Sequence, residues 1–409
     1  MNNTEQSIQN TVRFDTKLES FNDIITLFSD NLNRIKESGK KVIAKSPLFP
    51  AEPIYAAGGL AYDPYLYEVI PALIKGKRHL IGKATDAGLS SDLNFCNLIM
   101  AGAFISGENE ISVDAHSAAC GFWDDQISNT WQMMAEASQK PIHFWEVPRF
   151  DNNTEKWAIN FLIKELEQYF EWLTNQTGNS ITENSLREAV RMGNLIRQDI
   201  IELNQLLQNQ EILFPALEYY ITQLMISDFA QNPERLHVAY QKLIQELKER
   251  QLNHSKPADS SEKAIRIFLT GEEIPDIRIW NQIEDYGGII VGFDSRMSLY
   301  YKPIKEDGPI IENLACWIYG MPSSMPTAQR MNSTISFIKS QKPDAVIISS
   351  IAGSTIFPES NTLISQIIQD ELGVPIFYLE TKFPFEIVKP TYQELEAFIQ
   401  NLKDGKNRG

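Results

Sequence analysis

The chain has 409 residues, 43% of them hydrophobic and 22% charged, which is typical of a folded protein and far from a disordered one. This length predicts two or three domains rather than one core. The net charge of -16, with no cluster of Lys and Arg, argues against nucleic-acid binding, because phosphate contacts need basic side chains.

No apolar run reaches the roughly 18 residues of a membrane span, and residues 1–16 lack the pattern of an export signal. We therefore expect a cytoplasmic protein that does not bind a membrane. Its three cysteines, Cys96, Cys120 and Cys316, are expected to be reduced thiols.

The first part of the chain predicts a helix followed by an α/β domain. Apolar residues recur at helical spacing between residues 15 and 39, so residues 1–40 are predicted to form an N-terminal helix that ends at Gly39. Short apolar runs at residues 41–44, 54–59, 110–113 and 142–147 then alternate with helical stretches. This alternation is typical of a parallel sheet and predicts a first α/β domain over residues 41–150.

The middle of the chain is predicted to be helical. Strand signals are absent between residues 155 and 250, and long amphipathic patterns take their place, so residues 151–252 are predicted to form a helical insert. Thr182 is the expected N-cap of one of its helices. Residues 253–262 are polar, contain Pro and Ser and have no periodicity, which indicates a linker.

The last part repeats the pattern of the first. Strands are predicted at residues 265–269, 289–291, 345–348 and 375–379, with a helix face at 277–283. Gly287 and Gly288 are expected to end that helix. Residues 263–409 are therefore predicted to form a second α/β domain.

The loops that follow the strands are the expected ligand sites, because open parallel sheets bind ligands beyond the carboxyl ends of their strands. The loop expected after Val113 contains His116 and Cys120, and the loop expected after Ile348 contains Ser354. No glycine cluster has the spacing of a dinucleotide-binding fingerprint, so NAD is not expected.

Four segments resemble the 2-hydroxyacyl-CoA dehydratase and benzoyl-CoA reductase family. Pro50–Gly58 is similar to its Pro-x-Glu-x-Ile-x-Ala-Ala-Gly element and Ser90–Leu93 to its Ser-x-Asp-Leu-Cys run, and Thr177–Arg197 and Pro343–Ile347 are similar to its helical insert and to a late strand. Their order and spacing carry the resemblance. It implies two flavodoxin-like, Rossmann-like α/β domains with a helical insert between them, as in one D-component-type subunit of a heterodimer.

The resemblance also implies a site for a four-iron four-sulfur cluster, which family subunits hold through three cysteines. Cys120 falls at the second cysteine, Asn94 stands where the first is expected, and Ser354 occupies the third place. An amide and a hydroxyl are weak, uncharged ligands compared with thiolate, so a cluster held by this chain alone is disfavoured. Alternatively, Cys96 and Cys120 bind a cluster together with an oxygen ligand from Ser354 or a substrate.

Other candidate residues have both a functional and a structural interpretation. Glu52 is either a general acid or base or a helix-capping carboxylate. His116 is either a proton donor beside Cys120 or a structural histidine. Cys96 and Cys316 are interpreted as helix core. Aromatic residues of the same region line an acyl pocket or fill the core: Phe122, Trp123, Trp131, Phe144 and Trp145.

The resemblance implies an acyl thioester, such as an acyl-CoA, as ligand and a homologous subunit as partner. The first hypothesis is a cluster-poor or auxiliary subunit that uses Glu52, His116, Ser354 and Cys120 for binding or acid–base work. The second is a functional iron–sulfur dehydratase subunit that removes water from a 2-hydroxyacyl-CoA by a ketyl-radical route. The third is a binding or scaffold protein without chemistry.

Overall fold

Two parallel sheets organise the chain. The computed structural model describes residues 13–14, 18–47, 49–120, 126–147, 155–208, 214–252, 264–294, 302–321, 327–354, 358–381 and 388–408. Within these ranges, one four-stranded sheet has the order β2-β1-β3-β4 and the other has the order β6-β5-β7-β8. Both orders are those of a flavodoxin-like domain, in which the chain reverses direction across the sheet next to its first strand.

The first sheet is built from short strands that are paired in parallel throughout. Its strands are β1 (Val42–Lys45), β2 (Leu60–Tyr62), β3 (Ala115–Cys120) and β4 (Ile142–Glu146). The helical segments between them are α4 (Glu52–Ala56), the π-helical turn η1 (Tyr65–Val69), α5 (Ile70–Lys75), α6 (His79–Asp86), α7 (Phe95–Ser106) and α8 (Ile127–Ser138). Both faces of the sheet are covered, and β1 is therefore buried along its whole length.

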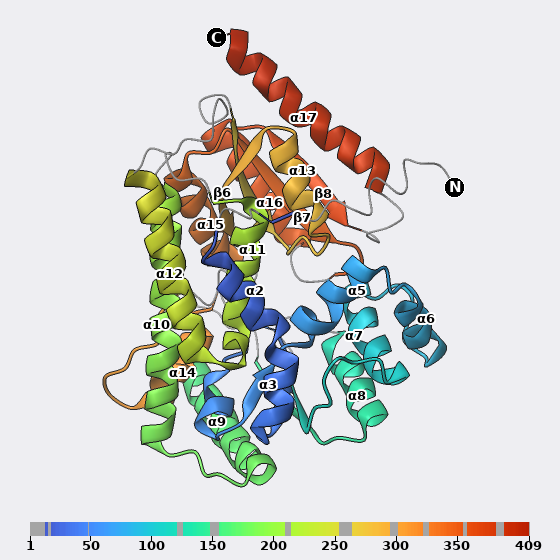
Figure 1. Ribbon diagram of the computed structural model, residues 1–409, viewed down its shortest axis with the longest axis vertical. Helices are drawn as coiled ribbons and strands as arrows, with labels where there is room; N and C mark the ends of the chain where they lie inside the picture. The colour runs from blue at the N-terminus through green and yellow to red at the C-terminus, as the bar shows by residue number, and fades with distance from the viewer. Residues whose placement is uncertain are drawn as a thin grey trace.

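Long helices form the insert between the sheets. They are α9 (Glu155–Thr177), α10 (Glu183–Gln208), α11 (Ala216–Leu224) and α12 (Pro233–Leu252), with two short 3-10 turns, η2 (Met225–Ser227) and η3 (Phe229–Gln231). Figure 1 shows α10 and α12 side by side along one edge of the molecule. The N-terminal helix α2 (Phe21–Ser29) packs against α12, and α3 (Asn31–Ser38) follows α2 in the chain.

The second sheet consists of β5 (Ile265–Gly271), β6 (Gly288–Asp294), β7 (Ala345–Ile351) and β8 (Ile376–Thr381). Its helical segments are α13 (Arg278–Asp285), α14 (Ile310–Tyr319), α15 (Thr327–Gln341), α16 (Pro358–Ile367), the π-helical turn η5 (Ile368–Leu372) and α17 (Val388–Arg408). One large apolar cluster runs from the first domain through the insert into the second sheet. A smaller one, which includes Phe268, Val346 and Ile348, fills the sheet's other face.

Several predicted boundaries are confirmed. Ser185 donates its backbone N–H to Thr182 Oγ1 at 3.0 Å and Thr182 donates its own to Ser185 Oγ at 3.0 Å, so Thr182 caps α10 as expected. Gly287 follows α13 with a φ of +91°, which is the left-handed conformation of a helix end. The predicted linker at 253–262 lies outside the described residues.

Two predicted strands of the first domain are wrong. Residues 54–59 were expected to be extended, but α4 occupies Glu52–Ala56 and β2 begins only at Leu60. Pro53 at the first turn favours the helix. The strand expected at residues 110–113 lies at Ala115–Cys120, where partners on both sides compensate for the low strand propensity of its alanines.

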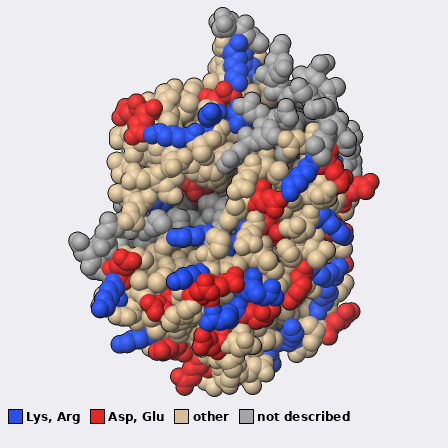
Figure 2. Space-filling view, turned by 90° about the vertical axis from the view of Figure 1, so that its left-hand side faces the viewer, with Lys and Arg blue, Asp and Glu red and all other residues tan. Residues whose placement is uncertain are grey.

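The surface carries both signs of charge. Figure 2 shows Lys and Arg interspersed with Asp and Glu over the lower half of the face in view. No helix in the described ranges is long and apolar enough to cross a membrane.

Candidate functional site

The crevice expected to bind a ligand in the first domain lies between the carboxyl ends of β1 and β3, where the strand order reverses. Ser46, directly after β1, donates its backbone N–H to Ser117 O at 2.9 Å and accepts one from Ala119 at its hydroxyl, also at 2.9 Å. These bonds hold the start of the loop that leads to Glu52 against the end of β3, which finishes at Cys120.

Glu52 is the buried carboxylate of this loop. It is the first residue of α4, is 0% exposed and forms an ion pair with Arg197 of α10, with Oε1 at 2.6 Å from Nη2. Glu52 Oε2 has no hydrogen-bond partner in the part of the chain that the structure describes. A buried carboxylate needs a compensating charge, and Arg197, itself 0% exposed, supplies it.

Arg197 also joins the three parts of the molecule. Its guanidinium lies 4.8 Å from the ring centroid of Trp317 in α14, a cation–π contact with the second domain. One turn earlier, Asn194 donates to Ile304 O at 2.7 Å and accepts from Ile304 N at 2.8 Å. The same turn of α10 therefore contacts the first domain through Glu52 and the second through Ile304 and Trp317.

A second buried polar cluster lies at the ends of β1 and β2. Lys45 Nζ donates to Ser227 Oγ at 3.3 Å, Ser227 donates to Asp63, and Asp63 donates its backbone N–H to Asp228 Oδ2 at 3.2 Å. Burial, followed by repulsion from Asp63, raises the pKa of Asp228 to about 8. Sequence analysis missed this cluster, because its members are far apart in the chain and share no motif.

Asp228 also holds a strained turn. The next three residues, Phe229, Ala230 and Gln231, have φ values of 54°, 50° and 51°, a left-handed run that costs on the order of 1 kcal/mol or more per residue. The Asp228 carboxyl group accepts from Ala230 N at 3.1 Å and from Gln231 Nε2 at 2.5 Å. The Asp228 carbonyl accepts from Tyr55 Oη at 2.5 Å, which ties the turn to α4, the helix that carries Glu52.

Asn94 is the N-cap of α7. Its Oδ1 accepts from Cys96 N at 2.9 Å, and its own backbone N–H donates to Gln126 Oε1 at 2.8 Å. Cys96 is buried in the first turn of α7, as the core interpretation of this residue predicts. Asn94 therefore has a structural function that suits an amide.

Ser354 follows β7 in the second domain and is 8% exposed. Its hydroxyl donates to Glu272 Oε1, and Glu272 Oε2 accepts from Ile351 N at 2.5 Å. Glu272 follows β5, so this pair marks the place in the second sheet where the strand order reverses. Sequence analysis identified Ser354 but missed Glu272.

The loops of Asn94 and Ser354 touch. A Cβ built at Gly353 would lie 2.5 Å from Asp92 O and 3.0 Å from Asn94 N. Gln126, which directly precedes α8, donates from Nε2 to Gly353 O at 2.5 Å. The structure thus brings together two of the three loops in which the family resemblance places cluster ligands.

The cysteines lie on three separate elements. Cys120 ends β3 and is half-buried, and burial, followed by the charge of Glu146, raises its pKa to about 11. Cys316 in α14 is exposed, so the prediction of a core residue is wrong there. Among the described residues, no group of three or more His, Cys, Asp or Glu side chains is placed to hold a metal ion.

His116 lies inside β3 and not in a loop, so its predicted location is wrong. Its ring packs against Phe104 and Trp131, and its Nε2 is 2.9 Å from Ser138 Oγ. Burial lowers the pKa of His116 to about 4. This position favours the structural interpretation, because the side chain lies in the layer between β3 and α7–α8.

The predicted aromatic pocket is largely core. Trp131 and Trp145 are fully buried, and Trp145 Nε1 donates to Ser117 Oγ at 3.0 Å. Phe144 is partly buried against the same cluster. Phe122 and Trp123 lie outside the described residues.

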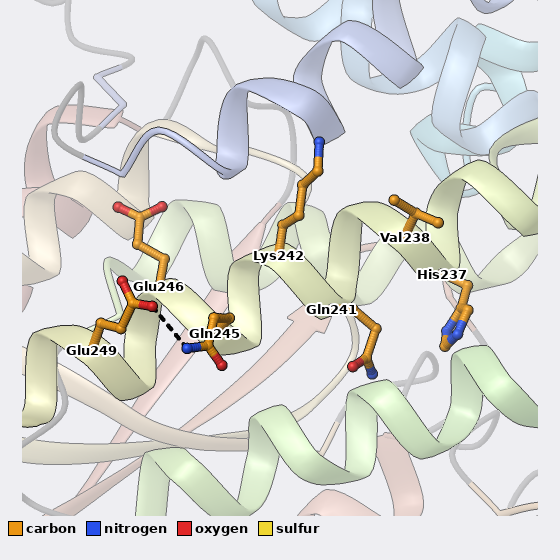
Figure 3. A pocket seen from close by; sticks show the side chains of 7 residues that line it. All are labelled: His237, Val238, Gln241, Lys242, Gln245, Glu246 and Glu249. Atoms are coloured by element: carbon orange, nitrogen blue, oxygen red, sulfur yellow. Dashed lines mark hydrogen bonds between the residues drawn. The ribbon is translucent and has the colours of Figure 1, made fainter.

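A hollow of about 470 Å³ lies away from the strand ends, on the outer side of α12. In Figure 3, Lys242 points toward α2, and His237 and Gln241 point toward α10. His237 Nδ1 lies 2.6 Å from Asp199 Oδ2, and Gln241 donates to Asp199 Oδ1 at 2.5 Å. These side chains join α12 to its neighbouring helices, so their arrangement is that of a helix interface.

The sequence model of the family described as "2-hydroxyglutaryl-CoA dehydratase, D-component" matches residues 48–402. The chain belongs to this family. No curated protein matches the chain significantly. The match includes α4 with Glu52, the insert with Arg197 and both loops that meet at Gly353.

For this family member, the residues at the expected cluster positions do not fit a four-iron four-sulfur cluster. Asn94 and Ser354 are neutral, and both side chains already bond to protein groups. Cys120 alone is a cysteine at a family position, whereas such clusters need several thiolates. The alternative set of Cys96, Cys120 and Ser354 gains no support, because Cys96 lies buried in α7.

Proposed function

We propose that this chain is a cluster-poor component of a 2-hydroxyacyl-CoA dehydratase-like system, which binds an acyl thioester and acts beside a homologous partner subunit. The family match over residues 48–402 supports the general role of a dehydratase component. The neutral side chains of Asn94 and Ser354, which stand at positions where the family resemblance places cluster ligands, support a subunit that leaves electron transfer to its partner.

One observation carries the binding role. Glu52 Oε2 is buried and has no hydrogen-bond donor in the described residues. A buried acceptor without a donor costs free energy, roughly 1–3 kcal/mol, which a ligand that donates a hydrogen bond would recover. The hydroxyl group of a 2-hydroxyacyl thioester is such a donor.

Residue roles follow from this geometry. Glu52 accepts a hydrogen bond from the ligand and is the candidate acid–base group, with Arg197 compensating its charge. Ser354 donates its hydroxyl to Glu272, so it offers the ligand only an acceptor. His116 has no part in the proposal, because its ring packs against Phe104 and Trp131 and its Nε2 lies 2.9 Å from Ser138 Oγ.

Thermal unfolding tests the proposal. 2-Hydroxyglutaryl-CoA at about 100 times its Kd should stabilise the native chain by roughly 2.7 kcal/mol and raise its Tm, because a ligand of the folded state shifts the equilibrium. Separate measurements with free coenzyme A and with 2-hydroxyglutarate show whether binding needs both the coenzyme A part and the acyl part of the thioester. If no acyl-CoA ester raises Tm, the scaffold hypothesis replaces this one.

A pair of double variants identifies the site. E52Q/R197M removes both charges of the buried pair, so the variant should fold, but the thioester should not raise its Tm. D276N/R278M is the matched control, because Arg278 and Asp276 form a largely buried 2.6 Å ion pair in the second domain. The thioester should raise the Tm of this control variant as much as it raises that of the wild type.

A further inference from the structure

Gln126 connects the two α/β domains at their strand ends. Its Oε1 accepts from Asn94 N at 2.8 Å and from Asn97 Nδ2 at 3.3 Å, both in the first domain. Its Nε2 donates to Gly353 O, in the second domain, at 2.5 Å. A single amide therefore uses its acceptor on one domain and its donor on the other.

The backbones on the two sides are in contact. Gly353 has a φ of +79°, and a Cβ built there would lie 2.5 Å from Asp92 O. Even a methyl group would force the loops apart at this point. The loop after β7 thus approaches the loop before α7 as closely as its glycine allows.

The charge next to Ser354 suits a hydroxyl group and not a thiolate. Glu272 is 2% exposed and accepts the Ser354 hydroxyl on one oxygen and the backbone N–H of Ile351 on the other. A thiolate at position 354 would place a second negative charge beside this buried carboxylate, which is unfavourable. Serine is neutral and donates the hydrogen bond that Glu272 accepts.

We propose that a metal-free polar seam joins the two domains here and replaces the cluster that the family resemblance assigns to these loops. The polar seam consists of Asp92, Asn94, Gln126, Gly353, Ser354 and Glu272. It rests on the cluster-poor role proposed above, but its hydrogen bonds can be tested without any thioester. The polar seam fixes the position of the carboxyl ends of one sheet relative to those of the other. A cluster bound by the same loops would contribute to this fixation.

Hydrogen exchange on the full chain tests the seam. Q126A removes the bridge and should raise exchange roughly tenfold at the amides of Asn94 and Ser354, which belong to different domains. Q126E keeps the acceptor for Asn94 N but cannot donate to Gly353 O, so it should affect mainly the second-domain loop. Q132A is the matched control, because Gln132 lies in α8, the helix that Gln126 precedes, and its amide donates locally to Glu136 at 2.8 Å.

Anaerobic reconstitution of the wild-type chain with iron and sulfide is the second measurement. Substoichiometric iron after desalting is expected, whereas about four irons per chain would overturn the seam. Unchanged exchange in both loops of Q126A and Q126E would also overturn it. Failure to bind thioesters is a separate result that overturns the proposed function and leaves the exchange data intact.

Discussion

At the scale of single residues, buried charges decide how the strand ends are built. Glu52 and Arg197 are both fully buried and come from different parts of the chain. Removing one partner of such a pair leaves an uncompensated charge, whereas removing both is often tolerated. Comparing single and double variants therefore distinguishes the contribution of the ion pair to stability from the proposed contact of Glu52 with a ligand.

We predict that R197M lowers the free energy of unfolding by about 3–5 kcal/mol, because it leaves the Glu52 carboxylate buried without its cation. E52Q/R197M should recover most of that loss. Urea unfolding of the single and double variants measures both values. Equal losses in the two proteins would show that the pair matters only through its packing.

Glu68 gives a pH prediction. It lies in η1, accepts from Tyr62 Oη and from Glu110 N, and burial raises its pKa to about 8 from 4.5. Between these two values the folded state holds a proton that the unfolded state loses, so stability falls as pH rises from about 4.5 to 8.

E68Q should remove this pH dependence, because the amide imitates the protonated acid at every pH. The variant should match the wild type near pH 5 and be more stable, by roughly 3 kcal/mol, near pH 8. Urea midpoints measured across the range test this. If the urea midpoints of the wild type and of E68Q change with pH in parallel, the raised pKa of Glu68 is contradicted.

At the scale of elements, close packing of α6 against α7 depends on a glycine. A Cβ at Gly102 in α7 would lie 1.9 Å from the backbone carbonyl oxygen of Leu80 in α6. Backbone cannot move aside as a flexible side chain can, so this contact fixes how closely the two helices approach.

We predict that G102A destabilises the chain by at least about 2 kcal/mol, although alanine favours helices. G82A is the matched control in α6, where nothing lies within 4 Å of the added methyl group. It should stabilise by about 0.5–1 kcal/mol. Chemical unfolding of both variants measures these changes. If G102A were as stable as G82A, the close contact of α7 with α6 at Gly102 would be contradicted.

The sequence predicted the elements that local chemistry determines. The cap at Thr182 and the helix end at Gly287 were found because each position favours a small set of residue types. The strand at Ala115–Cys120 was misplaced because its small residues have weak strand propensity and depend on β1 and β4. Glu52 and Ser354 were identified, but their partners Arg197 and Glu272 lie too far along the chain for any local pattern.

At the scale of the whole molecule, the insert and the polar seam hold the two flavodoxin-like domains together at separate points. Arg197 contacts α4 and Trp317, and Gln126 bridges the loop before α7 and the loop after β7. Hydrophobic core continues between these points. Protein groups of the insert and of the polar seam thus hold the strand ends of both sheets.

The central claim is that the chain binds an acyl thioester without a cluster of its own. Calorimetric titration of the wild-type chain with 2-hydroxyglutaryl-CoA, with and without prior treatment with an iron chelator, tests it most directly. We predict saturable binding with the same Kd in both samples. No binding in either sample, or binding only in iron-loaded protein, would contradict the account.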